Sequence, residues 1–300
     1  MKLHTLIGNT ELFRGGTNSG LYHLSDSNLA VIDPGLSESR GRRFSEYAQS
    51  NHKRITHLIG THEHSDHIGA LSGILCDFPD CHVLIDHKGK HILESPDIFL
   101  AYINGGAPNH ELRGYFRPLK TRSVPVHGLS EGPVTIGEST FEWFHFGGHS
   151  VGSAGVITPD GVLFLGDTLI PSEILSKFKL PLLYSVDGQY HAFNQLENTD
   201  YELCVTGHGK KVLTKPECIQ LAVENRQIME ACLNLLLGAV KTPQTKEALM
   251  AFLIDKLTLT LNYKEYLFGM SSVSSLLSYL IDKEEVTVVL ENNHLLYKLR

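Results

Sequence analysis

The sequence has little cysteine, and its five cysteines form no paired motif. An odd number without any Cys-x-x-Cys pair argues against a disulfide framework. Most of these residues lie in apolar runs, so we expect reduced and mostly buried thiols. The five positions are Cys76, Cys81, Cys204, Cys218 and Cys232.

Long apolar segments and an excess of positive charge are also absent. No run approaches the roughly 20 apolar residues that cross a bilayer, and residues 1–8 lack the apolar core of a secretory signal. The net charge of −7, with histidine neutral, argues against polyanionic partners. We therefore expect a cytoplasmic protein that binds neither a membrane nor nucleic acid.

Histidine, by contrast, is concentrated in one short stretch. Residues 61–67 read Thr-His-Glu-His-Ser-Asp-His, which places three imidazoles and a carboxylate within six positions. Imidazole nitrogen and carboxylate oxygen suit zinc and its neighbours in the first transition row. A helix cap, the simpler interpretation, accounts for only one or two of these side chains.

The flanking pattern places this stretch in a turn between a strand and a helix. The preceding run 55–60 is short and mostly apolar, as in a buried strand. From Ser65 onward, Ile68, Leu71 and Ile74 recur at helical spacing, which predicts one continuous helix. Open α/β sheets commonly place their chemistry at such a turn.

The stretch resembles the His-x-His-x-Asp-His signature of the metallo-β-lactamase superfamily. Three later motifs follow in the family's order: Gly-Gly-His-Ser at 147–150, Leu-Gly-Asp at 165–167 and Gly-His-Gly at 207–209. Each is weak alone because such turns are common, but their joint occurrence is specific. The resemblance implies an αββα sandwich of four layers and a metal-dependent hydrolase.

The resemblance also implies a ligand set and a cofactor. Two zinc ions per chain are expected, with iron or manganese as alternatives. Two metals about 3.5–4 Å apart can hold and acidify a water molecule, which makes the two carboxylates of the set catalytic candidates as well. The first metal would be held by His62, His64 and His149, and the second by Asp66, His67 and His208, with Asp167 as the bridge.

Two further residues near the motifs are assigned from their positions. Glu63, inside the first motif, is expected to be a solvent-facing spacer. The family's oxygen-reducing diiron members carry Glu at the position of His64, so this chain favours the hydrolytic branch. Asp33, in an Asp-Pro-Gly that resembles the family's early strand end, would orient a ligand by hydrogen bonding. An Asx turn before Pro34 is the alternative.

Candidate substrate contacts come from two regions. Residues 95–126 lose clear periodicity and are expected to form an irregular insert. The family resemblance implies that this insert helps to wall the active-site cleft. Its candidates are Tyr115 and Arg117, and a plain surface connection is the alternative. Tyr184, Tyr190 and His191 are the candidates from residues 168–203, with aromatic packing equally open.

The character of the sequence becomes helical after Lys215. We expect helices at 217–237 and 271–281, with another between them capped by Thr242 and carrying Pro243 at its first position. Two β-type segments follow, at 285–290 and 294–299. This order resembles a small winged-helix domain, so we divide the chain into a catalytic domain, 1–216, and a C-terminal domain, 217–300.

The charge pattern of this C-terminal domain disfavours nucleic acid. The segment 271–281, which would be the reading helix, contains no Lys or Arg, whereas phosphate neutralisation needs a basic face. Packing on the catalytic domain or formation of a homodimer is the better interpretation. The leading function is a zinc-dependent hydrolase of a small ester, thioester, lactone or similar carbonyl compound. A ribonuclease or phosphodiesterase of the same family and a mononuclear iron persulfide dioxygenase are the alternatives.

Overall fold

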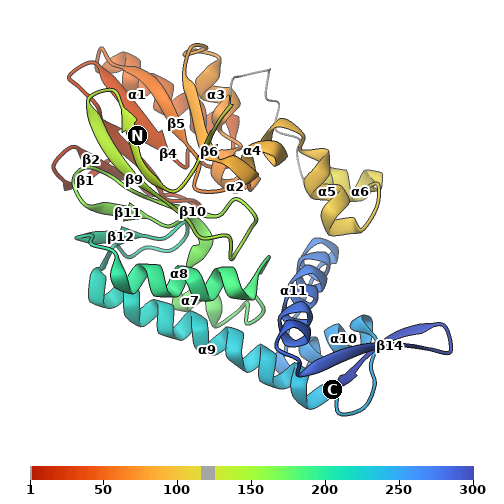
Figure 1. Cartoon of the computed structure of the whole chain (residues 1–300). Coiled ribbons are helices and arrows are strands. Elements are labelled where there is room, and N and C mark those ends of the chain that lie inside the picture. The colour runs from red at the N-terminus through yellow and green to blue at the C-terminus, as the bar shows by residue number, and fades with distance from the viewer. Residues whose placement is uncertain (1, 116–125) are drawn as a thin grey trace.

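The computed structural model describes residues 2–115 and 126–300, apart from the side chain of Tyr115. Within these residues the strands form two main sheets and a separate hairpin (Figure 1). The first sheet consists, in spatial order, of β1 (His4–Ile7), β2 (Thr10–Phe13), β3 (Ser19–His23), β4 (Asn28–Ile32), β5 (Arg54–Ile59), β6 (His82–Asp86) and β7 (Val126–Leu129). The second consists of β13 (Leu213–Thr214), β12 (Leu203–Val205), β11 (Val162–Phe164), β10 (Ala154–Ile157), β9 (Ser139–His145) and β8 (Gly132–Ile136).

The first sheet changes from antiparallel to parallel pairing at β4. Strands β1 to β4 pair antiparallel, whereas β4 to β7 pair parallel. Parallel neighbours require crossover connections, and helix α1 (Glu38–Ser50) forms the one between β4 and β5. The carboxyl ends of β4 and β5 therefore reach the same edge of the sheet.

Three hydrophobic clusters separate four layers. On β4, Leu29 and Val31 face the cluster beneath α1, and the alternate residues Ala30 and Ile32 face the cluster between the two sheets. The third cluster lies between the second sheet and the helices α8 (Val186–Asn198) and α9 (Lys215–Ala239). The predicted αββα sandwich is confirmed.

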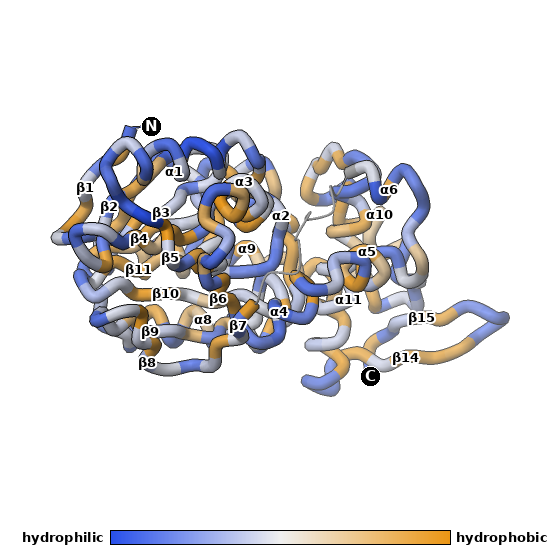
Figure 2. The backbone as a smooth tube through the Cα atoms, turned by 90° about the horizontal axis from the view of Figure 1, so that it is seen from above, coloured by the Kyte–Doolittle hydropathy of each residue, from blue (hydrophilic) through white to orange (hydrophobic). Residues whose placement is uncertain are grey.

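The C-terminal region contains the predicted helices followed by a hairpin. Helices α10 (Lys246–Leu257) and α11 (Tyr263–Asp282) precede β14 (Val286–Glu291) and β15 (His294–Leu299), and the hairpin extends away from the body of the molecule (Figures 1 and 2). The third hydrophobic cluster runs on into α10 and α11 without interruption. The boundary between 216 and 217 and the winged-helix resemblance stay predictions.

The helix after the first motif is broken, contrary to expectation. It forms two short pieces, α2 (Ser65–Ile68) and α3 (Leu71–Leu75). The backbone of Gly35 inserts between them, since its N–H donates to His67 O at 2.7 Å and its carbonyl accepts from Ala70 N at 2.6 Å. These two bonds replace part of the helical hydrogen-bond ladder, a tertiary effect that spacing alone does not show.

The described part of the insert is helical, so the prediction of an irregular segment is wrong for it. Helix α4 (His87–Glu94) leads into α5 (Asp97–Asn104) and α6 (His110–Tyr115). Gly105 ends α5 in the left-handed conformation, with φ of 69°. Pieces this short give too few turns for a periodic pattern to be recognised. In Figure 2, α5 and α6 lie beside α10 and α11, to one side of the sheets.

The predicted cap of α10 is also wrong. Thr245, not Thr242, is the N-cap, and its side chain accepts a hydrogen bond from Ala248 N. The backbone of Gln244 pairs with Tyr297 of β15 in both directions, at 3.0 and 2.8 Å. This β-bridge holds Gln244 outside the helix, which begins at Lys246, three residues later than the Thr-Pro pattern indicates.

The structure bears on the expectations for the cysteines and for membrane-spanning segments. All five cysteines are free thiols, four of them buried and Cys76 exposed. Across the described residues, none of the helices combines the length and apolar character that crossing a membrane requires.

Candidate metal centre

Four turns meet at one edge of the two sheets. In the turn after β5, Thr61 O accepts a hydrogen bond from Ala154 N of β10, at 2.8 Å. Asp167 lies in the 3₁₀ turn η1 (Gly166–Thr168), directly after β11. The turn after β12 joins it through Gly207 N and Gly166 O, at 2.7 Å. These bonds bring motifs 62–67, 147–150, 165–167 and 207–209 together.

Three imidazoles form the first group. His62, His64 and His149 each present a ring nitrogen, and these nitrogens all lie within 4.8 Å of one another. His149 Nε2 faces His64 Nδ1 at 3.1 Å. The His62 ring is 4.6 Å from that of His64 and 5.1 Å from that of His149. Three nitrogens so close together and so buried can hold one metal ion.

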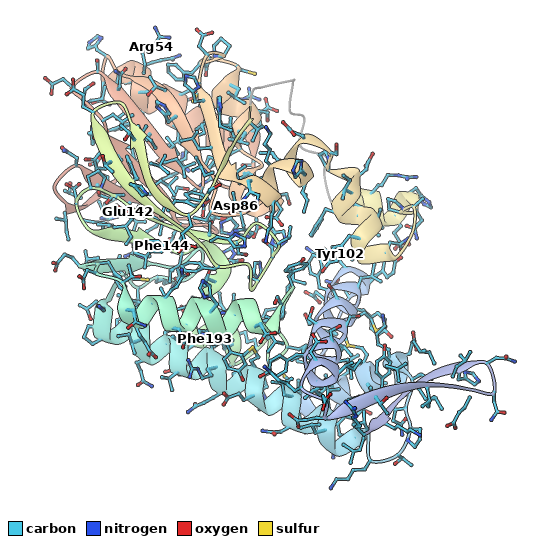
Figure 3. The ribbon with its side chains drawn as sticks, in the orientation of Figure 1. Arg54, Asp86, Tyr102, Glu142, Phe144 and Phe193 are labelled. Atoms are coloured by element: carbon cyan, nitrogen blue, oxygen red, sulfur yellow. The ribbon has the colours of Figure 1, made fainter. Side chains whose placement is uncertain are left out.

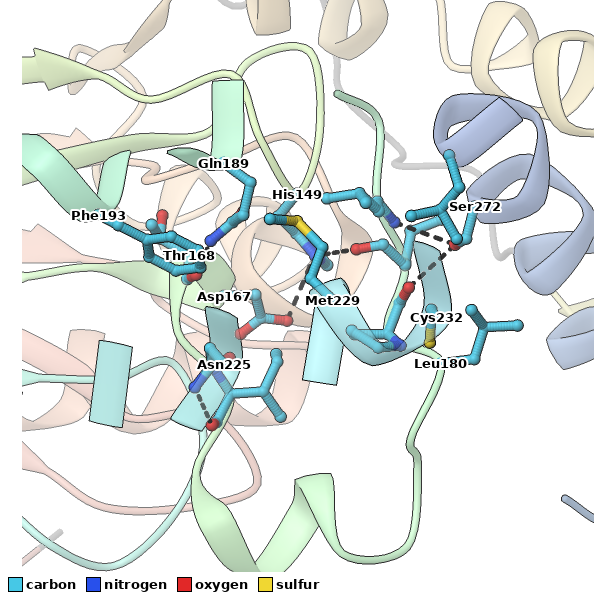
Figure 4. A pocket seen from close by; sticks show the side chains of 15 residues that line it. His149, Asp167, Thr168, Leu180, Gln189, Phe193, Asn225, Met229, Cys232 and Ser272 are labelled. Carbon is cyan, nitrogen blue, oxygen red and sulfur yellow. Dashed lines mark hydrogen bonds and ion pairs between the residues drawn. The ribbon is translucent and has the colours of Figure 1, made fainter. Parts of the chain in front are cut away.

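The second group contains two imidazoles and two carboxylates. Asp66, His67, Asp167 and His208 also place one donor atom each within 4.8 Å of the others. His208 Nε2 lies 3.3 Å from Asp66 Oδ2 and 3.4 Å from Asp167 Oδ2. Asp167 Oδ2 is in addition 3.8 Å from His149 Nε2 of the first group, as Figure 4 shows. Asp167 therefore faces both groups.

In four of the histidines, Nδ1 already has a hydrogen-bond partner outside the two groups, which leaves Nε2 of each ring directed at the centre. A ligating histidine typically donates its other N–H to such an outer acceptor. Inside the centre, His62 Nε2 is buried and has no hydrogen-bond partner among the described residues, and His67 Nε2 faces Asp167 Oδ1 at 3.3 Å. The residues present thus fit a metal centre. The outer pairs are His62 Nδ1 with Thr61 Oγ1 (3.2 Å), His67 Nδ1 with Asp33 Oδ2 (2.9 Å), His149 Nδ1 with Leu182 O (3.1 Å) and His208 Nδ1 with Gly16 O (2.6 Å).

The two groups differ in their electrostatics. Burial, reinforced by His149, lowers the pKa of His64 to about 3, so the first group presents neutral imidazoles. Burial would also lower the pKa of His208, but hydrogen bonds to Asp167 and Asp66 raise it to about 10. The two carboxylates of the second group therefore attract positive charge strongly, as a cation site requires.

The arrangement matches a known family. A family model described as the metallo-beta-lactamase superfamily matches residues 12–208, a range that contains both groups. The chain belongs to the metallo-beta-lactamase superfamily. The chain is therefore a hydrolase of this superfamily, in agreement with the relatives that it matches.

Individual relatives agree with this membership. Over 204 residues the chain is 26% identical to a probable metallo-hydrolase of Bacillus subtilis, YqgX, covering 65% of this chain and 87% of that protein. Over 145 residues it is 26% identical to hydroxyacylglutathione hydrolase 2 of Vibrio vulnificus, covering 48% of this chain but only 44% of the relative. The crystal structure of a beta-lactamase domain protein from Burkholderia ambifaria superposes with a TM-score of 0.78 at 16% identity, covering 99% of this chain and 94% of that one. The shared fold thus includes the C-terminal helices.

Asp33 forms the expected hydrogen bond to a histidine of the first motif. Its Oδ2 accepts from His67 Nδ1 at 2.9 Å and from Thr61 Oγ1 at 2.7 Å, and its Oδ1 accepts from Thr61 N at 2.8 Å. Asp33 has a φ of 47°, a left-handed conformation that Asp tolerates better than most residues. The expected hydrogen bond is confirmed, and its partner is His67, one of the predicted ligands.

Glu63 is not a solvent-facing spacer, so that prediction is wrong. Its side chain is buried at 5% exposure and accepts a hydrogen bond from Ser150 Oγ at 3.1 Å. Burial raises the pKa of Glu63 to about 7. Gly152 makes the room, because a Cβ there would lie 2.6 Å from Glu63 Oε2. Glu63 thus joins the first motif to the loop that carries His149.

Gly166, the glycine of the third motif, is required there for a steric reason that the sequence does not reveal. A Cβ at Gly166 would lie 2.2 Å from Thr61 Oγ1 and 3.1 Å from His62 Nδ1, and the residue has a φ of 51°. Only glycine combines that conformation with such a close approach. Gly166 therefore lets Asp167 come within reach of both groups.

The predicted substrate contacts divide into three cases. Tyr184 lies beside the first group, where it lines a cavity together with His64 and His149. Tyr190 instead packs on Tyr279 at 5.9 Å and donates to Glu230 Oε1 at 3.3 Å, and His191 is exposed on α8. The Tyr115 side chain and Arg117 lie outside the described residues.

The insert was expected to wall the cleft, but the residues singled out in it were Tyr115 and Arg117, and the two aromatics beside the centre were missed. Phe99 of α5 has its ring 5.1 Å from that of His64, and Tyr102 lies on the same helix (Figure 3). The run Ile98-Phe99-Leu100 was the available signal, since an apolar run within a proline-rich insert is unusual for a surface connection.

Proposed function

We propose that this superfamily hydrolase binds two zinc ions and cleaves an ester, thioester, lactone or similar small carbonyl compound. The observation that carries the proposal is Asp167, whose Oδ2 lies 3.8 Å from His149 Nε2 and 3.4 Å from His208 Nε2. A single carboxylate that faces both groups suits a bridge between two cations. Iron and manganese are the alternatives that the same donors accept.

The chain's own residues set up this chemistry. Asp66 and Asp167 concentrate negative charge, and the outer hydrogen bonds fix the imidazole rings before any substrate arrives. Two zinc ions, when bound, supply an electrophile for a carbonyl oxygen and acidify a water molecule. A relative named hydroxyacylglutathione hydrolase supports an acyl substrate, although the match spans only 44% of that protein.

Elemental analysis of the purified full chain, followed by a substrate panel, tests the proposal. We expect about two zinc ions per chain and turnover of at least one ester, thioester or lactone. A single iron per chain with oxygen uptake on a persulfide would replace the hydrolase by the dioxygenase alternative. Preferential cleavage of RNA would favour the nuclease.

Asp167→Asn tests the bridge directly. The amide keeps the shape of the side chain but removes charge that faces both groups, so we expect kcat/KM to fall by about 100-fold or more and the second zinc to be lost. The melting temperature of the metal-free protein should change little. Asp200→Asn, at an exposed position paired with Lys215, is the matched control. Unchanged turnover in Asp167→Asn would remove this residue from the site.

A further inference from the structure

An apolar cavity of about 180 Å³ lies beside the three-imidazole group. His64 and His149 form the wall nearest the metal centre, and Phe99, Val151 and Leu182 are among the apolar residues that line the remainder. Sites for whole drug-sized ligands span about 300–1,000 Å³. The cavity is therefore sized for one part of a small substrate.

The lining comes from three segments that are distant in the sequence. Helix α5 contributes Ile98, Phe99 and Tyr102, the loop after His149 contributes Val151, and the segment before α8 contributes Leu182 and Tyr184. Ile98, Tyr102 and Tyr184 are 52%, 49% and 41% exposed, although they are large apolar or aromatic side chains. Exposed apolar side chains gathered at one opening mark a binding site more often than chance.

The walls are held in place before any ligand binds. Tyr102 OH and Ser271 Oγ of α11 form a hydrogen bond of 2.9 Å, which fixes the face of α5 that lines the cavity (Figure 3). The segment before α8 is fixed to the same helix, because Ser272 Oγ accepts from Leu183 N at 3.1 Å. Small-molecule sites are usually preformed in this way.

We propose that this cavity binds a compact, uncharged hydrocarbon group of the substrate, adjacent to the bond that is cleaved. The proposal rests on the proposed function, because the metal centre defines where that bond lies. Phe99 is the central contact, since its ring lies 5.1 Å from that of His64. An anionic group would lose its hydration against this mostly apolar lining, so the cavity favours an uncharged one.

Two series of substrates locate the hydrocarbon group. In the first series the acyl chain lengthens while the alcohol or thiol stays constant, and in the second the leaving group lengthens while the acyl group stays constant. Each buried CH₂ should raise kcat/KM roughly fourfold in one series, up to the length that fills the cavity, and a terminal carboxylate should abolish the gain. Flat profiles in both series would overturn the proposal.

Variants then assign the effect to the cavity. Phe99→Ala should flatten the profile that rises, and Val151→Phe should shift its optimum to a shorter chain. Phe178→Ala, which removes an exposed aromatic outside the lining, should leave the profile as in the wild type. Zinc content, measured for every variant, separates loss of the cavity from loss of the centre.

A binding measurement keeps this inference separate from the proposed function. Titration of the zinc-loaded protein with 1-hexanol, followed by calorimetry or NMR, needs no turnover. We expect saturable binding that Phe99→Ala weakens about tenfold or more and Phe178→Ala does not change. If the substrate panel fails while this binding is found, the reaction assignment is wrong and the hydrocarbon site stands. Wild-type binding in Phe99→Ala would overturn the site itself.

Discussion

Orientation of the imidazoles depends on side chains and carbonyls that are not among the predicted ligands. Asp33 is the one charged group among these outer partners, and it also holds the backbone of the first motif through Thr61 N. A carboxylate in this position fixes the ring of His67 and makes its inner nitrogen a better donor. The second group should therefore depend on Asp33 for its metal affinity.

Asp33→Asn tests that dependence. Loss of the charge beside His67 Nδ1 should weaken the second zinc site about 10- to 100-fold, measured by competition with a chromophoric chelator. Glu11→Gln removes a comparable carboxylate–imidazole pair, with His23 at 2.9 Å, outside the centre. Equal zinc affinity in the two variants would show that Asp33 only stabilises the loop.

A second cluster of histidines, on the strands β5 to β7, should make the fold sensitive to acid. The ring of His57 stacks on that of His82 at 5.2 Å, and His82 Nδ1 lies 3.3 Å from His127 Nε2. Burial, followed by repulsion from His82 and His127, lowers the pKa of His57 from 6.5 to about 4. Between pH 4 and 6.5, His57 is therefore mostly neutral in the folded chain and mostly protonated in the unfolded chain.

The sign of the effect follows from proton binding. Between pH 4 and 6.5 the unfolded state binds more protons, so the free energy of unfolding falls as the pH falls through this window. At about 1.4 kcal/mol per pKa unit, discounted for partial exposure, the loss due to His57 is on the order of 1 kcal/mol. Denaturant titrations at pH 5 and 7 should show a smaller difference for His57→Gln, whereas the exposed His294→Gln should behave as wild type. An unchanged pH difference in His57→Gln would assign the acid sensitivity elsewhere.

At the scale of elements, helix α11 supports the metal centre from a distance. Ser272 Oγ donates to Pro181 O at 2.9 Å, and Ser275 Oγ donates to Leu183 O at 2.8 Å. Between these two contacts lies Leu182, whose carbonyl oxygen is 3.1 Å from His149 Nδ1 and orients that ring. The C-terminal helix thus acts on the first group through one short segment.

The double variant Ser272→Ala/Ser275→Ala should loosen this segment. We expect a loss of about 1–3 kcal/mol in stability, because Leu183 N would be left buried without its acceptor. The first zinc site should also weaken roughly tenfold, the lower end of the range for outer partners. Ser274→Ala lies on the same helix but bonds only to Met270 O and Lys246 Nζ, so it separates a general helix effect from this contact. Unaltered zinc affinity in the double variant would mean that α11 has only a packing role.

Elements differed in how far the sequence predicted them. The mostly apolar run of β5 and the long apolar pattern of α9 depend on burial alone, and both elements were expected. The break at Gly35, the cap at Thr245 and the burial of Glu63 all depend on partners distant in the chain. The metal groups were predictable because their four motifs have fixed spacing and order, whereas Phe99 and Tyr102 belong to no motif.

One of the three hydrophobic clusters is shared across the predicted domain boundary. The cluster beneath the second sheet includes Leu163 of β11, Phe193 of α8, Leu233 of α9 and Leu276 of α11, all nearly inaccessible to solvent. A continuous core couples the unfolding of its parts. We therefore expect the catalytic and C-terminal regions to unfold in a single transition.

Leu276→Ala tests this coupling. Truncation at a site with 1% exposure should cost about 2–5 kcal/mol, and the loss should appear equally in circular dichroism of the full chain and in release of zinc. Leu290→Ala, at 73% exposure on the hairpin, should stay within about 0.5 kcal/mol of wild type. Two separate transitions, only one of which responds to Leu276→Ala, would show that residues 217–300 form an independent domain.

The spread of the ligand residues along the chain also has a consequence for biosynthesis. His62 to His67 leave the ribosome about 140 residues before His208, and α11, which holds the segment beside His149, follows later still. At about 5–20 residues per second, the first motif waits roughly 10–30 s for its partners. The nascent chain can therefore offer a metal ion only the local ligands of that first motif. The two groups that could hold metal are accordingly complete only after His208 has been synthesised and the last helix has packed against residues 181–183.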